Sequence, residues 1–252
     1  MTDEPTIPTL PHLPDEAGRV ADAAAEAGLA LALVGGIGVW MRCPSARVPP
    51  LARDYGDIDL VGHARDRKAI VALMESLGYT PDGMFNALHG ASRLNFTDEH
   101  RDRPVDVLLD TFRMAHELEL ADRFGPGDRT LPLADLLLTK LQIVSLNEKD
   151  VRDLGALLAD HPLGGPDAIE LPRILDATRG DWGLERTVHG TLQQLRGHLP
   201  GLGLERDVLD RVVARTQELD RALAEAPKSR RWKMRARVGE RVRWYEEPEE
   251  AR

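Results

Sequence analysis

The chain is short of cysteine, of aromatic residues and of long apolar runs, and each shortage excludes a class of protein. Its single cysteine, Cys43, excludes an intramolecular disulfide and a cysteine-rich zinc site. Only 4% of the 252 residues are aromatic, so the core must consist mainly of aliphatic side chains. The longest nearly apolar stretch, residues 29–41, contains three glycines and is shorter than the ~20 residues that a membrane-spanning helix needs.

The acidic balance of the chain limits the partners that its whole surface can bind. Lysine and arginine total 33, aspartate and glutamate total 42, and the formal charge is −9. A surface of this sign does not coat nucleic acid or anionic membrane, although a local basic patch is compatible with it. Residues 1–14 carry two acids and no apolar run, unlike a secretory signal, so we expect a cytoplasmic protein with no membrane partner.

Several common catalytic patterns are also missing. The chain has no Gly-x-Ser-x-Gly and no Gly-x-x-x-x-Gly-Lys, which disfavours a serine hydrolase and a Walker-type ATPase. Gly36 and Gly38 begin a Gly-x-Gly pattern that lacks the third glycine of a dinucleotide site. None of the eight histidines is paired at zinc-ligand spacing, which disfavours a histidine-based metal site.

The apolar spacing predicts an α/β fold with a mixed β-sheet flanked by helices, followed by an all-helical C-terminal domain. Strands are expected at 29–34, 57–61, 92–96 and 104–109, and the last two form a hairpin. Helices are expected at 15–27, 37–42, 65–77, 133–146, 148–160, 167–178, 182–198, 203–225 and 229–242. We predict a disordered lead-in at 1–14, an α/β core at 15–126, a helical domain at 127–245 and an acidic tail at 246–252.

Three aspartates are candidate metal ligands. In Asp57-Ile58-Asp59 the two acids are two residues apart, so on a strand both carboxylates point to one face. Asp106 interrupts the apolar strand at 104–109, where an acid is costly to bury unless it is paired or bound to metal. If these strands are neighbours, three carboxylates share one face, which suits two divalent metals in phosphoryl or nucleotidyl transfer. Two solvated acids at a strand end are the simpler interpretation, and Asp110 is an alternative third acid.

Two glycines precede this acidic strand. Gly35 and Gly36 follow an apolar strand and precede an expected helix, where backbone N–H groups can approach a phosphate closely. A tight turn explains the same pair without any ligand. Arg53, four residues before Asp57, is either a phosphate contact or a solvated loop arginine.

Taken together, these segments resemble a known superfamily. LALVGGIGVW, RDYGDIDLV and RPVDVLLD are similar to the nucleotidyltransferases related to DNA polymerase beta, and most similar to their AbiEii-type toxin and minimal nucleotidyltransferase branch. LADLLLTKLQIVSLNEKDVRDLGALL resembles the helical motif of that branch. The resemblance covers residues 29–160 and implies that Lys140 contacts phosphates and that Asp150 and Asp153 are the acids of the helical motif.

The resemblance implies a metal-dependent enzyme that moves an NMP group from an NTP to an acceptor hydroxyl. The expected metal ligands, for two Mg²⁺ ions, are Asp57, Asp59 and Asp106. The expected nucleotide-binding residues are Gly35, Gly36, Arg53 and Lys140. The acceptor stays open between an RNA or tRNA end, a protein and a small molecule, and a toxin role would add an antitoxin partner. The alternative is a catalytically degenerate nucleotide- or RNA-binding module.

A basic segment near the C-terminus is a candidate contact for an RNA acceptor. Lys228–Arg243 holds eight basic residues and one acid, with Trp232 inside it and Trp244 directly after it. Basic residues interleaved with stacking side chains are typical of RNA binding. The simpler interpretation is a terminal helix whose cations pair with an acidic body and whose tryptophans anchor it.

Overall fold

The computed structural model describes residues 9–164 and 168–247. These residues divide into two compact units, each built from three stretches of the chain. Unit 1 contains the residues up to Met41 together with Asp54–Phe112 and Glu119–Leu131. Unit 2 contains Arg42–Arg53, Arg113–Leu118 and the described residues from Pro132 onward.

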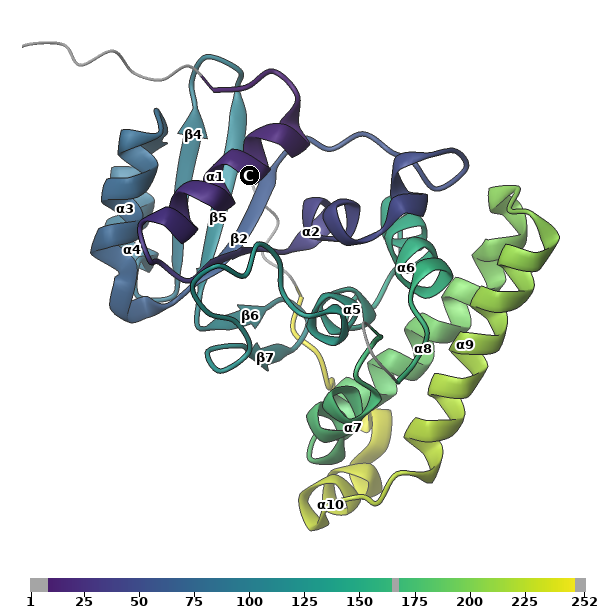
Figure 1. Cartoon of the computed structure of the whole chain (residues 1–252). Helices are drawn as coiled ribbons and strands as arrows, with labels where there is room; N and C mark the ends of the chain where they lie inside the picture. The colour runs from purple at the N-terminus through teal and green to yellow at the C-terminus, as the bar shows by residue number, and fades with distance from the viewer. Residues whose placement is uncertain (1–8, 165–167, 248–252) are drawn as a thin grey trace, which may run out of the picture. The chain divides into compact units, whose positions relative to one another are not determined.

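The strands and the first helices are short. The strands are β1 (Leu31–Leu33), β2 (Ile58–Gly62), β3 (Thr80–Pro81), β4 (Arg93–Asp98), β5 (Arg103–Leu109), β6 (Thr111–Arg113) and β7 (Glu117–Glu119). The helices of the N-terminal half are α1 (Leu13–Glu26), α2 (Gly35–Arg42), α3 (Arg67–Ser76) and α4 (Gly83–His89) (Figure 1).

Unit 1 is built on a five-stranded mixed sheet with the order β1-β2-β5-β4-β3. β2 and β5 run parallel, and every other neighbouring pair is antiparallel. β4 and β5 form the expected hairpin, joined by the short segment 99–102. The predicted α/β class with a mixed sheet is therefore confirmed.

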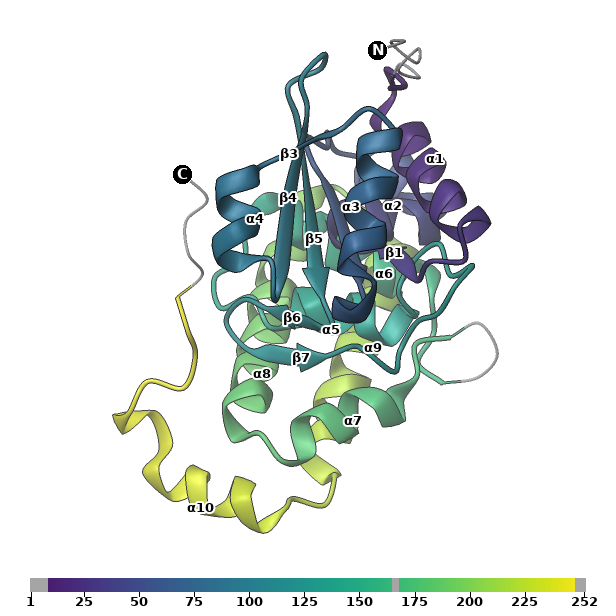
Figure 2. The same ribbon diagram turned by 90° about the vertical axis from the view of Figure 1, so that its left-hand side faces the viewer.

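One face of the sheet is the core of unit 1. Inward-facing residues such as Leu60, Phe96 and Val107 are buried in one cluster with the alanines of α1 and with Ile70 and Met74 of α3. The helices α1 and α3 cover this face of the sheet (Figures 1 and 2). The opposite face is more polar, because successive residues of a strand alternate between faces. Figure 2 shows α4 beside β4 on the side away from α3.

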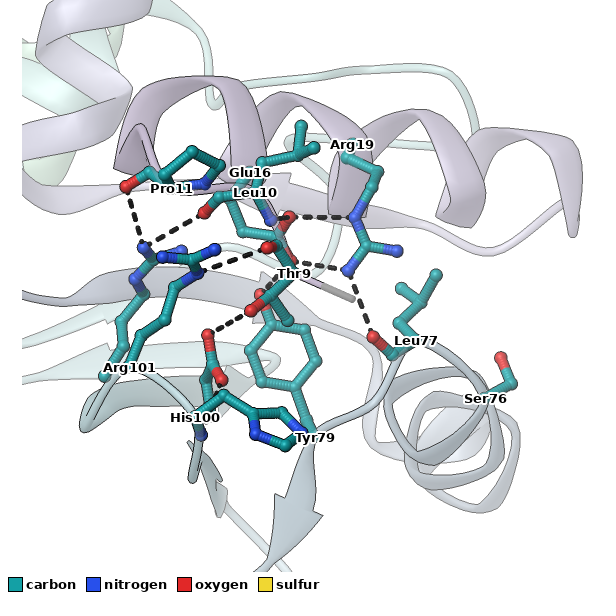
Figure 3. Close-up of polar contacts among 12 residues, drawn as sticks. Thr9, Leu10, Pro11, Glu16, Arg19, Ser76, Leu77, Tyr79, His100 and Arg101 are labelled. Carbon is teal, nitrogen blue, oxygen red and sulfur yellow. Dashed lines mark hydrogen bonds and ion pairs between the residues drawn. The ribbon is translucent and has the colours of Figure 1, made fainter. Parts of the chain in front are cut away.

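A buried carboxylate anchors the start of α1, as Figure 3 shows. Glu16 is fully buried and accepts hydrogen bonds from the Arg19 guanidinium, the Tyr79 hydroxyl and the Leu10 backbone N–H. Burial alone would raise the pKa of Glu16, but these hydrogen bonds outweigh it and hold the pKa below its ordinary value. The Thr9 hydroxyl donates to Asp98 at 2.6 Å, so the chain is held against the β4–β5 hairpin before the helix begins.

Unit 2 is mainly helical. Its helices are α5 (Leu133–Leu141), α6 (Glu148–Asp160), α7 (Leu171–Arg179), α8 (Trp182–His198), α9 (Arg206–Glu225) and α10 (Arg230–Val238). α6 packs against α5, α8 and α9, and α8 and α9 run side by side (Figure 1). Two short strands, β6 and β7, form a separate sheet. None of the helices in the described part of the chain is both long and apolar enough to cross a membrane.

Several element boundaries differ from the expectations. α1 begins at Leu13 because a proline is tolerated in the first turn of a helix. The helix expected from residue 37 begins at Gly35, so both glycines lie in its first turn. α4 was not expected. Residues 1–8 of the expected lead-in and 248–252 of the expected tail lie outside the described residues, and the predicted boundary at 126/127 stays a prediction.

Candidate functional site

Two of the three predicted acids face each other across the parallel strands of unit 1. Asp59 of β2 and Asp106 of β5 are directly paired in the register, and Asn95 of β4 is the next residue in the same row. Their strand neighbours Ile58 and Leu60 are fully buried on the core face. The row Asp59–Asp106–Asn95 therefore lies on the polar face of the sheet.

Asp57 lies outside this row. It is exposed and precedes the first residue of β2. Within the described residues, no three histidine, cysteine or acidic side chains gather in an arrangement that could hold a metal ion. The structure brings together Asp59 and Asp106, and the three-carboxylate ligand set stays a prediction.

Asp106 is held by two side chains of β4 that the sequence analysis did not select. The Arg93 Nε lies 2.8 Å from each carboxylate oxygen of Asp106, and the Arg93 Nη2 donates to Oδ2 as well. With its amide nitrogen turned toward Asp106, Asn95 donates to Oδ1 at 3.1 Å. The Arg93 guanidinium also lies 5.8 Å from the centre of the Phe85 ring of α4. Asp106 is therefore a carboxylate with a cation already in contact.

The start of α2 lies directly against Asp59. Gly35 has φ of 63°, and a Cβ at this position would lie 2.2 Å from Asp59 Oδ2. The Val34 N–H donates to the Asp59 carbonyl oxygen at 3.0 Å, which fixes the strand end beside β2. Glycine favours both this backbone conformation and this close approach, which places the positive end of α2 next to Asp59.

Asp110, the alternative third acid, has a different partner. It follows the last residue of β5 with φ of 61°, and its Oδ1 lies 3.2 Å from His63 Nδ1. The His63 ring stacks on Phe124 with the ring centres 4.7 Å apart. Asp106, not Asp110, is opposite Asp59 in the register.

The remaining predicted site residues form a cluster within unit 2, which we name the α6 charge cluster: Arg53, Lys140, Asp150 and Asp153. Arg53 binds Asp153 through two parallel hydrogen bonds of 2.8 and 2.9 Å. The Lys140 Nζ lies 2.8 Å from Asp153 and 3.2 Å from Asp150. Asp150 also completes a capping box with Asn147 at the start of α6. Asp153 thus pairs with both Arg53 and Lys140.

Burial and charge oppose each other in this cluster. Burial by itself would raise the pKa of Asp153, but Lys140 and Arg53 outweigh it and hold the pKa below its ordinary value. Burial would lower the pKa of Lys140, but Asp153 and Asp150 raise it above its ordinary value. Asp153 and Lys140 therefore each favour the charged form in the folded chain. Phosphate contact by Arg53 and Lys140 stays a prediction.

The basic segment is partly engaged within unit 2. Trp232 Nε1 donates to Glu185 at 3.0 Å, Lys228 pairs with the same carboxylate, and Trp244 Nε1 donates to Thr187. These two tryptophans serve as anchors, as the simpler interpretation expects. Five exposed cations make no ion pair within the described residues, and we name them the α10 cations: Arg230, Arg231, Lys233, Arg237 and Arg241.

No protein-family model matches the chain, and no curated protein matches it. Two solved structures are similar to it. One is a lincomycin-bound lincosamide antibiotic adenylyltransferase, LnuA, with 18% identity over 60% of this chain and 98% of that chain, at a TM-score of 0.40. The other is JHP933 from Helicobacter pylori, with 11% identity over 84% of this chain and 92% of that chain, also at a TM-score of 0.40.

The contacts of Asp106 had a weak signal in the sequence. In β4, Arg93, Asn95 and Thr97 alternate with buried residues, which marks a strand with one polar face. The hairpin prediction placed this strand beside Asp106. It did not fix the register, and a shift of one residue would turn Arg93 to the core face.

Proposed function

We propose that the chain is a nucleotidyltransferase that moves an NMP group from an NTP to an acceptor hydroxyl, with pyrophosphate leaving. The observation that carries the proposal is the acid pair Asp59–Asp106 with the start of α2 packed on Asp59 through Gly35. A helix start favours the phosphates of a nucleotide, and paired carboxylates favour the cation that accompanies them. The resemblance of the sequence to the polymerase-beta-like superfamily points to the same reaction.

The donor set fits Mg²⁺. This ion prefers carboxylate oxygens, and one or two carboxylates suffice when waters and substrate phosphates complete the shell. Asp59 and Asp106, with Asp57, would hold two Mg²⁺ ions. Bound Mg²⁺ would neutralise the triphosphate and lower the pKa of the attacking hydroxyl.

The residues of the chain itself would bind and orient the reactants. The N–H groups of Gly35 and Gly36 would donate to the triphosphate at the start of α2. Asp106 would orient the acceptor hydroxyl and accept its proton. Arg53 and Lys140 would contact phosphates only after exchanging their bonds to Asp153.

A degenerate nucleotide- or RNA-binding module is the second candidate. It is favoured by the contact of Arg93 with Asp106, because the guanidinium occupies carboxylate oxygens that a metal ion would need. Such a module would still bind an NTP at the start of α2. Both candidate functions therefore include NTP binding, and only the nucleotidyltransferase would also form a product.

We propose RNA as the first acceptor to test. The α10 cations are exposed and have no acidic partner within the described residues, so phosphates can reach them. Because Trp232 and Trp244 form hydrogen bonds within unit 2, this segment would contact RNA through its charges and not through base stacking. We also propose a protein or a small molecule as alternative acceptors, which other acceptor screens would test. A toxin role with an antitoxin partner is a further proposal.

The proposal is tested by incubating the protein with Mg²⁺, total tRNA or lysate, and each NTP in turn, radioactively labelled at the α-phosphate. The label that the acceptor gains is then measured. Wild type should label one class of acceptor, and Asp59→Ala and Asp106→Asn should abolish the labelling while leaving the fold intact. Asp110→Asn is the matched control, because Asp110 contacts His63 on the same face and should leave labelling unchanged. NTP-dependent thermal stabilisation without any labelled product would favour the degenerate module.

A further inference from the structure

Arg93 is a cation in direct contact with Asp106, the member of the Asp59–Asp106 pair on β5. Its guanidinium bridges both oxygens of Asp106, which also accepts from Asn95. A carboxylate has about four acceptor sites in total, so most of those on Asp106 are in use. A metal ion that binds Asp106 must therefore displace at least part of this contact.

The contact is open to displacement. The Arg93 side chain is 38% exposed and that of Asp106 20%, so solvent reaches both partners. An ion pair with this exposure is worth little, because water screens it and two side chains lose freedom to form it. Phe85 stays beside the guanidinium, so the side chain can leave Asp106 without losing every contact of its own.

We propose that Arg93 is a built-in counter-ion of the Asp59–Asp106 pair, which lowers the affinity of the nucleotide-free protein for divalent cations and makes cation binding depend on the nucleotide. The inference rests on the proposed function for the identity of the ligands. A cation arriving alone must expel the guanidinium into solvent. A cation arriving with a triphosphate brings phosphate oxygens, which match the planar donor fork of arginine.

Linkage makes the proposal quantitative. If Arg93 couples the two ligands, nucleotide must raise cation affinity by the same factor by which cation raises nucleotide affinity. Without Arg93, Asp106 loses the cation that contacts both of its oxygens, so a divalent cation that arrives alone should bind more tightly. A purely structural Arg93, which only ties β4 to β5, predicts no such gain.

The test is a Mn²⁺ titration of the full chain without nucleotide or acceptor, with free Mn²⁺ followed by electron paramagnetic resonance. We expect Arg93→Gln to bind Mn²⁺ about tenfold more tightly than wild type, and a non-hydrolysable NTP analogue to add less affinity in the variant than in wild type. Arg129→Gln is the matched control, since Arg129 forms a similar bidentate pair with Asp22 in unit 1 and should leave Mn²⁺ binding unchanged. Asp59→Asn combined with Arg93→Gln should remove the gain.

Each outcome decides one point. Unchanged or weaker Mn²⁺ binding by folded Arg93→Gln overturns the counter-ion role. If Arg93→Gln does not fold, Arg93→Lys is the deciding variant. Lysine keeps the charge but cannot form the bidentate contact with Asp106, so this variant should bind Mn²⁺ more tightly than wild type. Absence of saturable Mn²⁺ binding in every variant overturns this inference together with the metal role in the proposed function. Saturable binding with the predicted gain, but no transfer by wild type, overturns the proposed turnover alone.

Discussion

Gly35→Ala tests the close approach of α2 to the acid pair. The backbone at this position has φ of 63°, where a residue with a Cβ costs ~1–2 kcal/mol. The new methyl group would lie 2.2 Å from Asp59 Oδ2 and 3.1 Å from Asp59 Cγ, so the carboxylate must rotate away. A displaced side chain of this kind costs ~0.5–1.5 kcal/mol, which brings the expected loss in unfolding free energy to ~1.5–3.5 kcal/mol.

Gly28→Ala is the matched control for the backbone contribution. Gly28 has φ of 68°, and nothing lies within 4 Å of the position that a Cβ would take. Urea denaturation followed by circular dichroism should give ~1–2 kcal/mol for this control and a larger loss for Gly35→Ala. In an Asp59→Ala background most of the excess should disappear, because the carboxylate is removed and only the Cβ of residue 59, 3.2 Å away, stays close to the methyl group.

Two results would refute the reasoning. Equal losses for Gly35→Ala and Gly28→Ala would mean that no close approach exists between α2 and Asp59. An excess loss that is undiminished in the Asp59→Ala background would show that the Asp59 carboxylate is not its cause.

Three further predictions concern unit 2. Asp153→Ala should lower the unfolding free energy, measured by urea denaturation, by ~3–5 kcal/mol, because Arg53 and Lys140 stay buried without the carboxylate that they share. A loss under ~1 kcal/mol would contradict the pairing. Glu185 and Asp220 raise the pKa of His189 above its ordinary value of 6.5, so the stability it contributes is complete below that pH and is lost as pH rises through the raised pKa. His189→Gln should flatten the stability–pH curve above pH ~6.5, and an unchanged curve would exclude this contribution. Replacing the α10 cations with glutamine should lower the affinity for RNA in filter binding and reduce the salt dependence of that affinity, while Tm changes by only a few degrees. An unchanged affinity for RNA would favour another acceptor.

Local patterns predict most of the sheet of unit 1. Alternation and apolar runs are properties of single segments, so the β4–β5 hairpin and the acidic strand could be read directly from the sequence. The same holds for α6 and α8, whose bounds, 148–160 and 182–198, agree with the expected helices. α4 was missed because its seven residues are too few for a helical period to stand out.

Contacts between distant segments could not be predicted in the same way. Arg53 is four residues from Asp57 in sequence, yet its partner is Asp153, a hundred residues away and in the same unit as Arg53. The contact of Arg93 with Asp106 depends on the register of two strands, which no local pattern fixes. Sequence could therefore nominate the acids and two of the cations, Arg53 and Lys140, but not which cation pairs with which acid.

The order in which the chain builds the two units limits how the protein can be cut into fragments and how recombination can exchange one unit. The chain passes from one unit to the other at five points, after Met41, Arg53, Phe112, Leu118 and Leu131. A stop codon or a single protease cut after Leu131 would separate Arg53 and Leu51 from α6, whose Gly155 lies against Leu51. No single recombination event can exchange one unit for a homologous one and leave the other intact. The two units are thus expected to evolve as a linked pair, and split-protein complementation should restore folding only when the fragments are supplied together.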